Sequence, residues 1–149
     1  MTAEQQQHAR LWVPLVGEQH LLAVDWKLVD MDAGQIAFTD AVVRAPLMPD
    51  ETMRLGTEMH APGIATSNQY IELLRARGCV IEHHEDLSAE WSEVLVKRLA
   101  MYRSLRDTTV AKFGESHFAA WDHTYSFFVG LFTAGKLGGA RIAARKAAA

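Results

Sequence analysis

The sequence predicts an α/β domain with about three strands and two long, packed helices. Short apolar segments beside turn residues indicate strands at 35–40, 79–85 and 140–146. Two longer segments, 89–112 and 115–134, carry apolar and aromatic residues at helical spacing. Glycine and proline separate the two kinds of segment, as expected where strands and helices alternate.

Length and composition favour one globular domain. The chain has 149 residues, of which 49% are hydrophobic and 22% are charged, as is ordinary for a folded protein. The net charge of −3 gives no reason to expect nucleic acid or an anionic membrane as a partner. No apolar run reaches the ~20 residues of a membrane span, and the polar N-terminus is unlike a signal peptide. We expect a cytoplasmic protein, irregular over 1–17 and folded as one domain over 18–149.

The residues before the first strand are predicted to form an extended segment and one helix. Pro14 interrupts the apolar run 11–16, which indicates an extended or turn conformation. Helical spacing of apolar residues predicts a helix over 18–30. Turn residues at 32–34 then lead into the strand 35–40, whose centre is too apolar for a strand with one face in water. This strand is therefore expected to be buried on both faces.

Two shorter helices and a strand are predicted in the middle of the chain. A proline followed by two acidic residues is a favourable start for a helix over about 49–59. Thr66 or Ser67 can cap the next helix, and Gly78 ends it. The strand 79–85 begins apolar and becomes polar.

The two long helices are predicted from caps and apolar stripes. Ser88 can cap the helix 89–112, and Gly114 ends it. The helix 115–134 follows at once and ends at Gly135. Because the connection is short, the two helices are expected to pack as an antiparallel pair through their aromatic stripes.

Four segments together resemble one enzyme family. Residues 26–40 read as a helix and turn leading into a strand that ends Phe-Thr-Asp, and 73–79 read as a helix end, Leu-Leu-x-x-x-Gly-Cys. Residues 85–91 look like a turn from a strand into a long helix, and 135–141 look like the approach to a final strand. In this order the segments resemble the C-terminal half of class I S-adenosylmethionine-dependent methyltransferases of the small-molecule type, from near Glu18 onward.

The resemblance implies a truncated Rossmann-like sheet in which the last strand is antiparallel and lies between the other two. It also implies S-adenosylmethionine as the cofactor. The glycine-rich turn that follows the family's first strand has no counterpart here, nor has the acidic residue that binds the ribose. No cofactor-binding residue is therefore assigned. We expect the acceptor-binding half of a methyltransferase, with weak or no cofactor binding by this chain alone.

Five residues are candidates for the chemistry. Methyl transfer requires an acceptor held in line and usually a base that takes its proton. By resemblance, Asp40 lies at a strand end near the acceptor and could orient or deprotonate it, although it could also only cap a turn. His60, in the predicted cap loop, is a second candidate base or an exposed histidine without a role. Tyr102, Trp121 and Tyr125 could line an aromatic pocket for the acceptor or belong to the core.

The sequence gives little support for a metal site or a cysteine nucleophile. His83 and His84 are adjacent on a predicted strand, so their side chains point to opposite faces and cannot readily bind one ion. The single cysteine, Cys79, follows a glycine at the start of an apolar run, which favours a buried and unreactive thiol.

The resemblance also implies a partner and leaves three functions open. In the family, the strand that corresponds to 36–39 pairs with a strand of the other half, and an uncovered apolar edge invites pairing with another chain. We therefore expect a homo-oligomer or heteromer through this edge, and a small-molecule acceptor. The alternatives are a non-catalytic methyltransferase-like binding or regulatory module, and a non-methylating enzyme that uses the aromatic pocket with Asp40 and His60 as acid and base.

Overall fold

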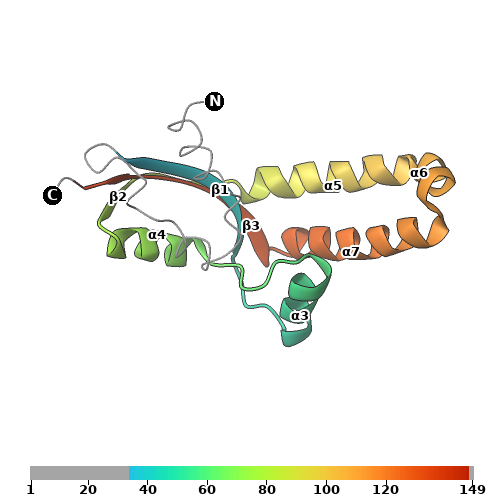
Figure 1. Cartoon of the computed structure of the whole chain (residues 1–149), viewed down its shortest axis with the longest axis horizontal. Helices are drawn as coiled ribbons and strands as arrows, with labels where there is room; N and C mark the ends of the chain where they lie inside the picture. The colour runs from blue at the N-terminus through green and yellow to red at the C-terminus, as the bar shows by residue number, and fades with distance from the viewer. Residues whose placement is uncertain (1–33, 148–149) are drawn as a thin grey trace, which may run out of the picture.

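A computed structural model describes residues 34–147 of the chain (Figure 1). The irregular segment predicted over 1–17 and the helix predicted over 18–30 lie outside the described residues. The described elements, in chain order, are β1 (Gln35–Val43), α3 (Pro49–Glu58), α4 (Ser67–Ala76), β2 (Cys79–Asp86), α5 (Ser88–Ser104), α6 (Arg106–Phe113), α7 (Glu115–Thr133) and β3 (Leu137–Lys146).

The three strands form one antiparallel sheet in the order β1-β3-β2. The predicted α/β class, the antiparallel last strand and its central position are confirmed. β3 is the most buried strand, because it has a neighbour on each side: Leu137 and Ile142 are fully buried, and Ala140 is 1% exposed. The strands are longer than predicted, since β1 continues to Val43 and β3 begins at Leu137.

Helix α4 covers one face of the sheet (Figure 1). Its Tyr70 and Leu74 are 1% exposed and belong to a core cluster against which Ile36 and Phe38 of β1 pack. The residues that alternate with these, such as Ala37, are exposed. The prediction that this strand is buried on both faces is therefore wrong. Alanine counts as apolar in a sequence pattern, but its single methyl group needs little cover.

Helices α5 and α7 form a long arm that extends away from the sheet, with α6 at its far end (Figure 1). α5 and α7 lie side by side in opposite directions, as predicted. The single helix predicted over 89–112 is wrong, because the structure breaks it at Leu105. There the backbone N–H of Leu105 donates to the Tyr102 carbonyl at 3.1 Å, three residues back, and the Ser104 hydroxyl donates to the Met101 carbonyl at 2.6 Å. These contacts end α5, and α6 turns the chain back toward α7.

Two glycines let the base of the arm approach the sheet closely. A Cβ atom on Gly139 of β3 would lie 2.5 Å from the Trp91 ring of α5, and one on Gly138 would collide with the Ser88 side chain. Ser88 also binds backbone there, since its hydroxyl accepts a hydrogen bond of 3.2 Å from the Gly139 N–H. Trp91 in turn stacks on Phe132 of α7 at a centroid distance of 6.3 Å. The arm is thereby fixed to the central strand.

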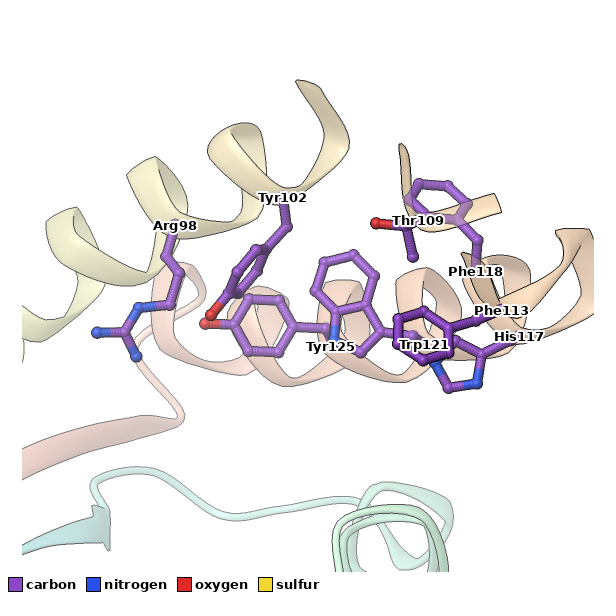
Figure 2. Close-up of a pocket in the computed structure, with 8 residues that line it drawn as sticks. All are labelled: Arg98, Tyr102, Thr109, Phe113, His117, Phe118, Trp121 and Tyr125. Atoms are coloured by element: carbon purple, nitrogen blue, oxygen red, sulfur yellow. The ribbon is translucent and has the colours of Figure 1, made fainter. Parts of the chain in front are cut away.

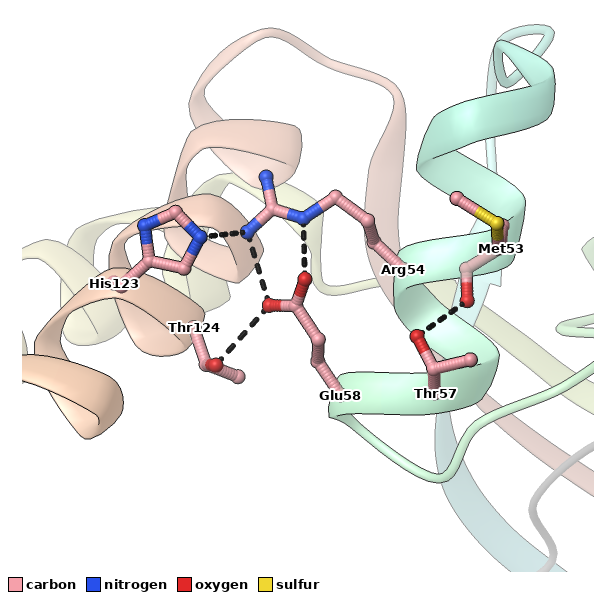
Figure 3. Close-up of polar contacts among 6 residues, drawn as sticks. All are labelled: Met53, Arg54, Thr57, Glu58, His123 and Thr124. Carbon is pink, nitrogen blue, oxygen red and sulfur yellow. Dashed lines mark hydrogen bonds and ion pairs between the residues drawn. The ribbon is translucent and has the colours of Figure 1, made fainter. Parts of the chain in front are cut away.

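Helix α3 is attached to the arm by a polar cluster (Figure 3). The Arg54 guanidinium donates to both carboxylate oxygens of Glu58, at 2.6 and 2.9 Å, and lies 3.9 Å from the centroid of the Phe127 ring on α7. The Thr124 hydroxyl of α7 donates to Glu58 at 3.1 Å, and His123 Nε2 lies 3.0 Å from Arg54 Nη2. Because arginine offers donors alone, Nε2 of His123 can only accept in this contact.

Candidate functional site

A hollow opens between the helices of the arm, where α5, α6 and α7 meet (Figure 2). Its volume is about 330 Å³. Aromatic side chains form most of its wall, joined by three polar ones. The lining residues are Arg98, Tyr102, Thr109, Phe113, His117, Phe118, Trp121 and Tyr125.

The structure brings the three aromatic residues predicted to form a pocket together in this hollow. The Tyr102 ring stands perpendicular to Trp121, with their centroids 5.2 Å apart. Trp121 and Tyr125 are stacked at 5.2 Å with an interplanar angle of 20°. Both arrangements are favourable for aromatic rings and hold them in fixed orientations. The binding of an acceptor by these residues stays a prediction.

The polar groups of the hollow give it a positive character. None of the eight lining residues is acidic. Figure 2 shows the guanidinium of Arg98 on the same side of the hollow as the hydroxyl of Tyr125. That hydroxyl is buried and makes no hydrogen bond within the described residues, and Arg98 lies close enough to it to lower its pKa. Burial raises the pKa of Tyr125, and the nearby Arg98 charge partly opposes this. The phenol is therefore protonated at neutral pH and can donate a hydrogen bond.

Asp40 lies inside β1 rather than at its end, because the strand continues to Val43. Its Oδ2 accepts a hydrogen bond of 2.5 Å from the hydroxyl of Tyr70, and its Oδ1 accepts one of 2.8 Å from the Ala41 N–H. It is not among the residues that line the hollow. These contacts orient the carboxylate toward α4.

His60 lies in the loop between α3 and α4, where its side chain is exposed. Its backbone has φ of 52°, the left-handed conformation that few residues other than glycine adopt. Within residues 34–147 it makes no hydrogen bond or ion pair, and it does not line the hollow. The structure thus does not bring His60 or Asp40 to the aromatic residues.

The described residues do not form a site that fits S-adenosylmethionine. The family's site needs a strand followed by a glycine-rich turn and a helix, whose backbone approaches the cofactor closely. In residues 34–147 the closely spaced glycines, Gly138 and Gly139, lie within β3 and are covered by Ser88 and Trp91. No residue in this part of the chain is therefore assigned to the cofactor.

A metal site is also not found where the structure describes the chain: no three histidine, cysteine or acidic side chains gather closely enough to hold an ion. His83 lies 3.2 Å from a carboxylate oxygen of Glu85 instead. Cys79 is buried as predicted, and burial raises the pKa of its thiol. In the same part of the chain, no helix is long and apolar enough to cross a membrane.

Arg98 is the charged residue among the lining residues of the hollow that the sequence analysis did not single out. It precedes Tyr102 by one helical turn, so the two share a face of α5. The signal that could have revealed Arg98 is its position one helical turn before Tyr102, which places a positive charge beside the aromatic stripe of the helix. Phe113, His117 and Phe118 were missed as site residues because the predicted single helix hid the turn that brings them to Tyr102.

No protein-family profile matches the sequence, and no curated protein is significantly similar to it. Solved structures, however, are similar. One is the mycolic acid cyclopropane synthase CmaA1 in complex with S-adenosylhomocysteine. The alignment covers 87% of this chain and 51% of the synthase, with a TM-score of 0.74 and 13% sequence identity. A second is the cyclopropane synthase MmaA2 from Mycobacterium tuberculosis. The alignment covers 96% of this chain and 50% of the synthase, with a TM-score of 0.72 and 12% sequence identity. Phosphoethanolamine N-methyltransferase 2 from Haemonchus contortus matches 77% with 27% of its own, at 0.67 and 15% identity.

The chain therefore spans about half the length of the two cyclopropane synthases and about a quarter of the N-methyltransferase. At these identities the similarity concerns the fold. The predicted resemblance is confirmed at that level: this chain has the fold of part of a methyltransferase-type α/β structure.

Proposed function

We propose that this chain contributes the acceptor-binding half of an S-adenosylmethionine-dependent small-molecule methyltransferase, with the cofactor held by a partner chain. One observation carries the proposal: a helical arm with an aromatic hollow is inserted between β2 and β3 of a sheet that has the methyltransferase-type fold. In this proposal Tyr102, Trp121 and Tyr125 hold the acceptor. Asp40 and His60, the candidate bases from the sequence, do not line this hollow, so neither is assigned a contact with an acceptor held there.

The hydrogen-bond pattern of β1 supports a partner at the sheet edge. The Lys146 N–H donates to the Gly34 carbonyl at 2.8 Å and the Arg44 N–H to the Lys136 carbonyl at 2.9 Å, at the two ends of the β1–β3 ladder. Because backbone groups alternate in direction along an antiparallel strand, even-numbered residues of β1 face β3 and odd-numbered residues face away. The Val43 N–H accordingly donates outward, to the Ala65 carbonyl at 3.0 Å.

The outward groups at 35–41 have no partner strand within the described residues. An unpaired edge of this length is a template for another strand. We propose that a strand of a second copy or of a different protein pairs here, as the strand of a cofactor-binding half would. Oligomerisation through 36–39 and S-adenosylmethionine binding across the assembly belong to the same proposal.

The test is calorimetry with S-adenosylhomocysteine on preparations whose oligomeric state is known from light scattering. We expect no binding by a monomer and binding by the complete assembly. Tight binding by a monomer would remove the need for a partner. An assembly that binds S-adenosylhomocysteine but transfers no methyl group to any acceptor would favour the alternative of a non-catalytic binding module. Turnover that is independent of the methyl donor and lost in His60→Ala would favour the non-methylating enzyme.

A further inference from the structure

We propose that the hollow in the arm binds a small planar aromatic carboxylate, with the ring against Tyr102 and Trp121 and the carboxylate at Arg98 and the Tyr125 hydroxyl. The assignment of this ligand as the methyl acceptor rests on the proposed function. Its binding to the hollow does not.

The size and wall of the hollow select a ring. A volume of about 330 Å³ is at the small end of the range for ligand pockets. It suits a molecule of one or two rings rather than a long lipid chain. The fixed perpendicular arrangement of Tyr102 and Trp121 leaves ring faces and edges against which another aromatic ring can pack.

The charges select an anion. α5 carries three cations, and two of them are already neutralised: Lys97 pairs with Glu93 at 2.5 Å, and Arg103 pairs with Asp122 at 2.6 Å. Arg98 is the third and has no ion pair within the described residues. The lining contains no carboxylate, so the positive charge of an aromatic cation would lie near the positive charge of Arg98 with no negative charge to balance either. A carboxylate ligand would instead form an ion pair with Arg98.

The Tyr125 hydroxyl supplies the second contact. A buried hydroxyl without a partner is costly, so native structures rarely keep one without a reason. Burial keeps this phenol protonated, and it therefore needs an acceptor rather than a donor. One carboxylate can accept from both the phenol and the guanidinium. Figure 2 shows the two groups on one side of the hollow.

The test uses three probes with the same ring and different charge: indole-3-acetate, indole-3-acetamide and tryptamine. Each is titrated calorimetrically into the full chain without a methyl donor. We expect the carboxylate to bind about tenfold more tightly than the neutral amide, as a charge-assisted hydrogen bond would give, and tryptamine to bind most weakly.

Variants locate the effect. Arg98→Gln should weaken indole-3-acetate about tenfold and leave the amide unchanged, and Tyr125→Phe should weaken the carboxylate about threefold or more. Lys97→Gln is the matched control: it removes the same charge one residue away, outside the hollow, and should change affinity less than about twofold. Equal binding of acid and amide, an equal effect of Lys97→Gln, or no binding at millimolar concentration would overturn the inference. Cofactor binding is measured separately, so either proposal can fail alone.

Discussion

At the scale of single residues, the Tyr125 hydroxyl carries a cost that can be measured without any ligand. It is buried and makes no hydrogen bond within the described residues. Tyr125→Phe removes that hydroxyl and keeps the stacked ring, so the free energy of unfolding should rise by about 1 kcal/mol. Urea denaturation at pH 7 measures the change. Tyr102→Phe is the control, because Tyr102 is 38% exposed and the change should be near zero. A loss of stability in Tyr125→Phe would show that the hydroxyl has a partner.

A second residue-scale prediction concerns the base of the arm. Gly139→Ala would place a methyl group 2.5 Å from the Trp91 ring, between a helix and a buried strand that cannot both move away. We expect a loss of about 1–3 kcal/mol, as is usual for overpacking. Gly130→Ala is the matched control in α7, where no atom outside the local helix backbone lies within 4 Å of the added methyl group. Since alanine favours helix, that variant should be neutral or gain up to about 1 kcal/mol. Chemical denaturation of both variants compares them directly.

At the scale of elements, the attachment of α3 should depend on pH. The hydrogen bond from Lys136 is the main cause that lowers the pKa of Glu51, and the one from Arg54 is the main cause for Glu58. A carboxylate whose pKa is lower in the folded state stabilises that state when the pH is above the ordinary pKa of 4.5. This stabilisation is lost as the pH falls through the lower pKa of the folded state. The melting temperature should therefore fall below about pH 4.5.

The double variant Glu51→Gln, Glu58→Gln tests this dependence. It should melt a few degrees lower than the parent at pH 7, and the difference should shrink toward pH 3, where the parent carboxylates are protonated too. Circular dichroism from pH 7 to pH 3 gives the two profiles. Glu72→Gln serves as the control, because Glu72 is exposed on α4 and makes no ion pair within the described residues. Parallel profiles for parent and double variant would contradict the assignment.

The elements also show what the sequence could and could not predict. Caps and breakers such as Pro49 and Gly114 are local signals, so the starts of α3 and α7 and the three described strands were predictable. The predicted Ser88 cap is wrong, because Leu87 is the N-cap of α5 and Ser88 is its first residue. The break at Leu105 was not, because no glycine or proline marks it: it depends on backbone contacts with Tyr102 and Met101 that form only in the fold. The aromatic trio of the hollow was predictable from its spacing. The role of Arg98 was not predictable, because it depends on the Tyr125 hydroxyl, which lies on the same side of the hollow only in the folded structure.

At the scale of the whole molecule, the edge of β1 that has no partner strand within residues 34–147 should determine assembly. The N–H of Ala37 points away from β3 by the alternation along the strand, and its side chain is exposed. Ala37→Pro removes this donor and places a ring at the edge, a position that sheets tolerate, so folding should persist. The chain is expected to associate at micromolar concentration, and Ala37→Pro should weaken association at least tenfold because a strand-pairing hydrogen bond is lost and the ring obstructs approach.

Multi-angle light scattering across a concentration series, with circular dichroism to verify folding, measures this effect. Ala37→Val is the matched control: it retains the N–H, adds similar bulk and favours a strand, so association should be unchanged. Pairing at the edge also predicts that the outward amides of 35–39 gain protection from hydrogen exchange as concentration rises, while those of β3 do not change. A parent chain that stays monomeric throughout would exclude pairing between copies, and equal association of the two Ala37 variants would place any interface elsewhere. If the parent is monomeric, the proposed partner of the edge is a different chain. Ala37→Pro then tests that pairing, because it should abolish cofactor binding by the reconstituted assembly.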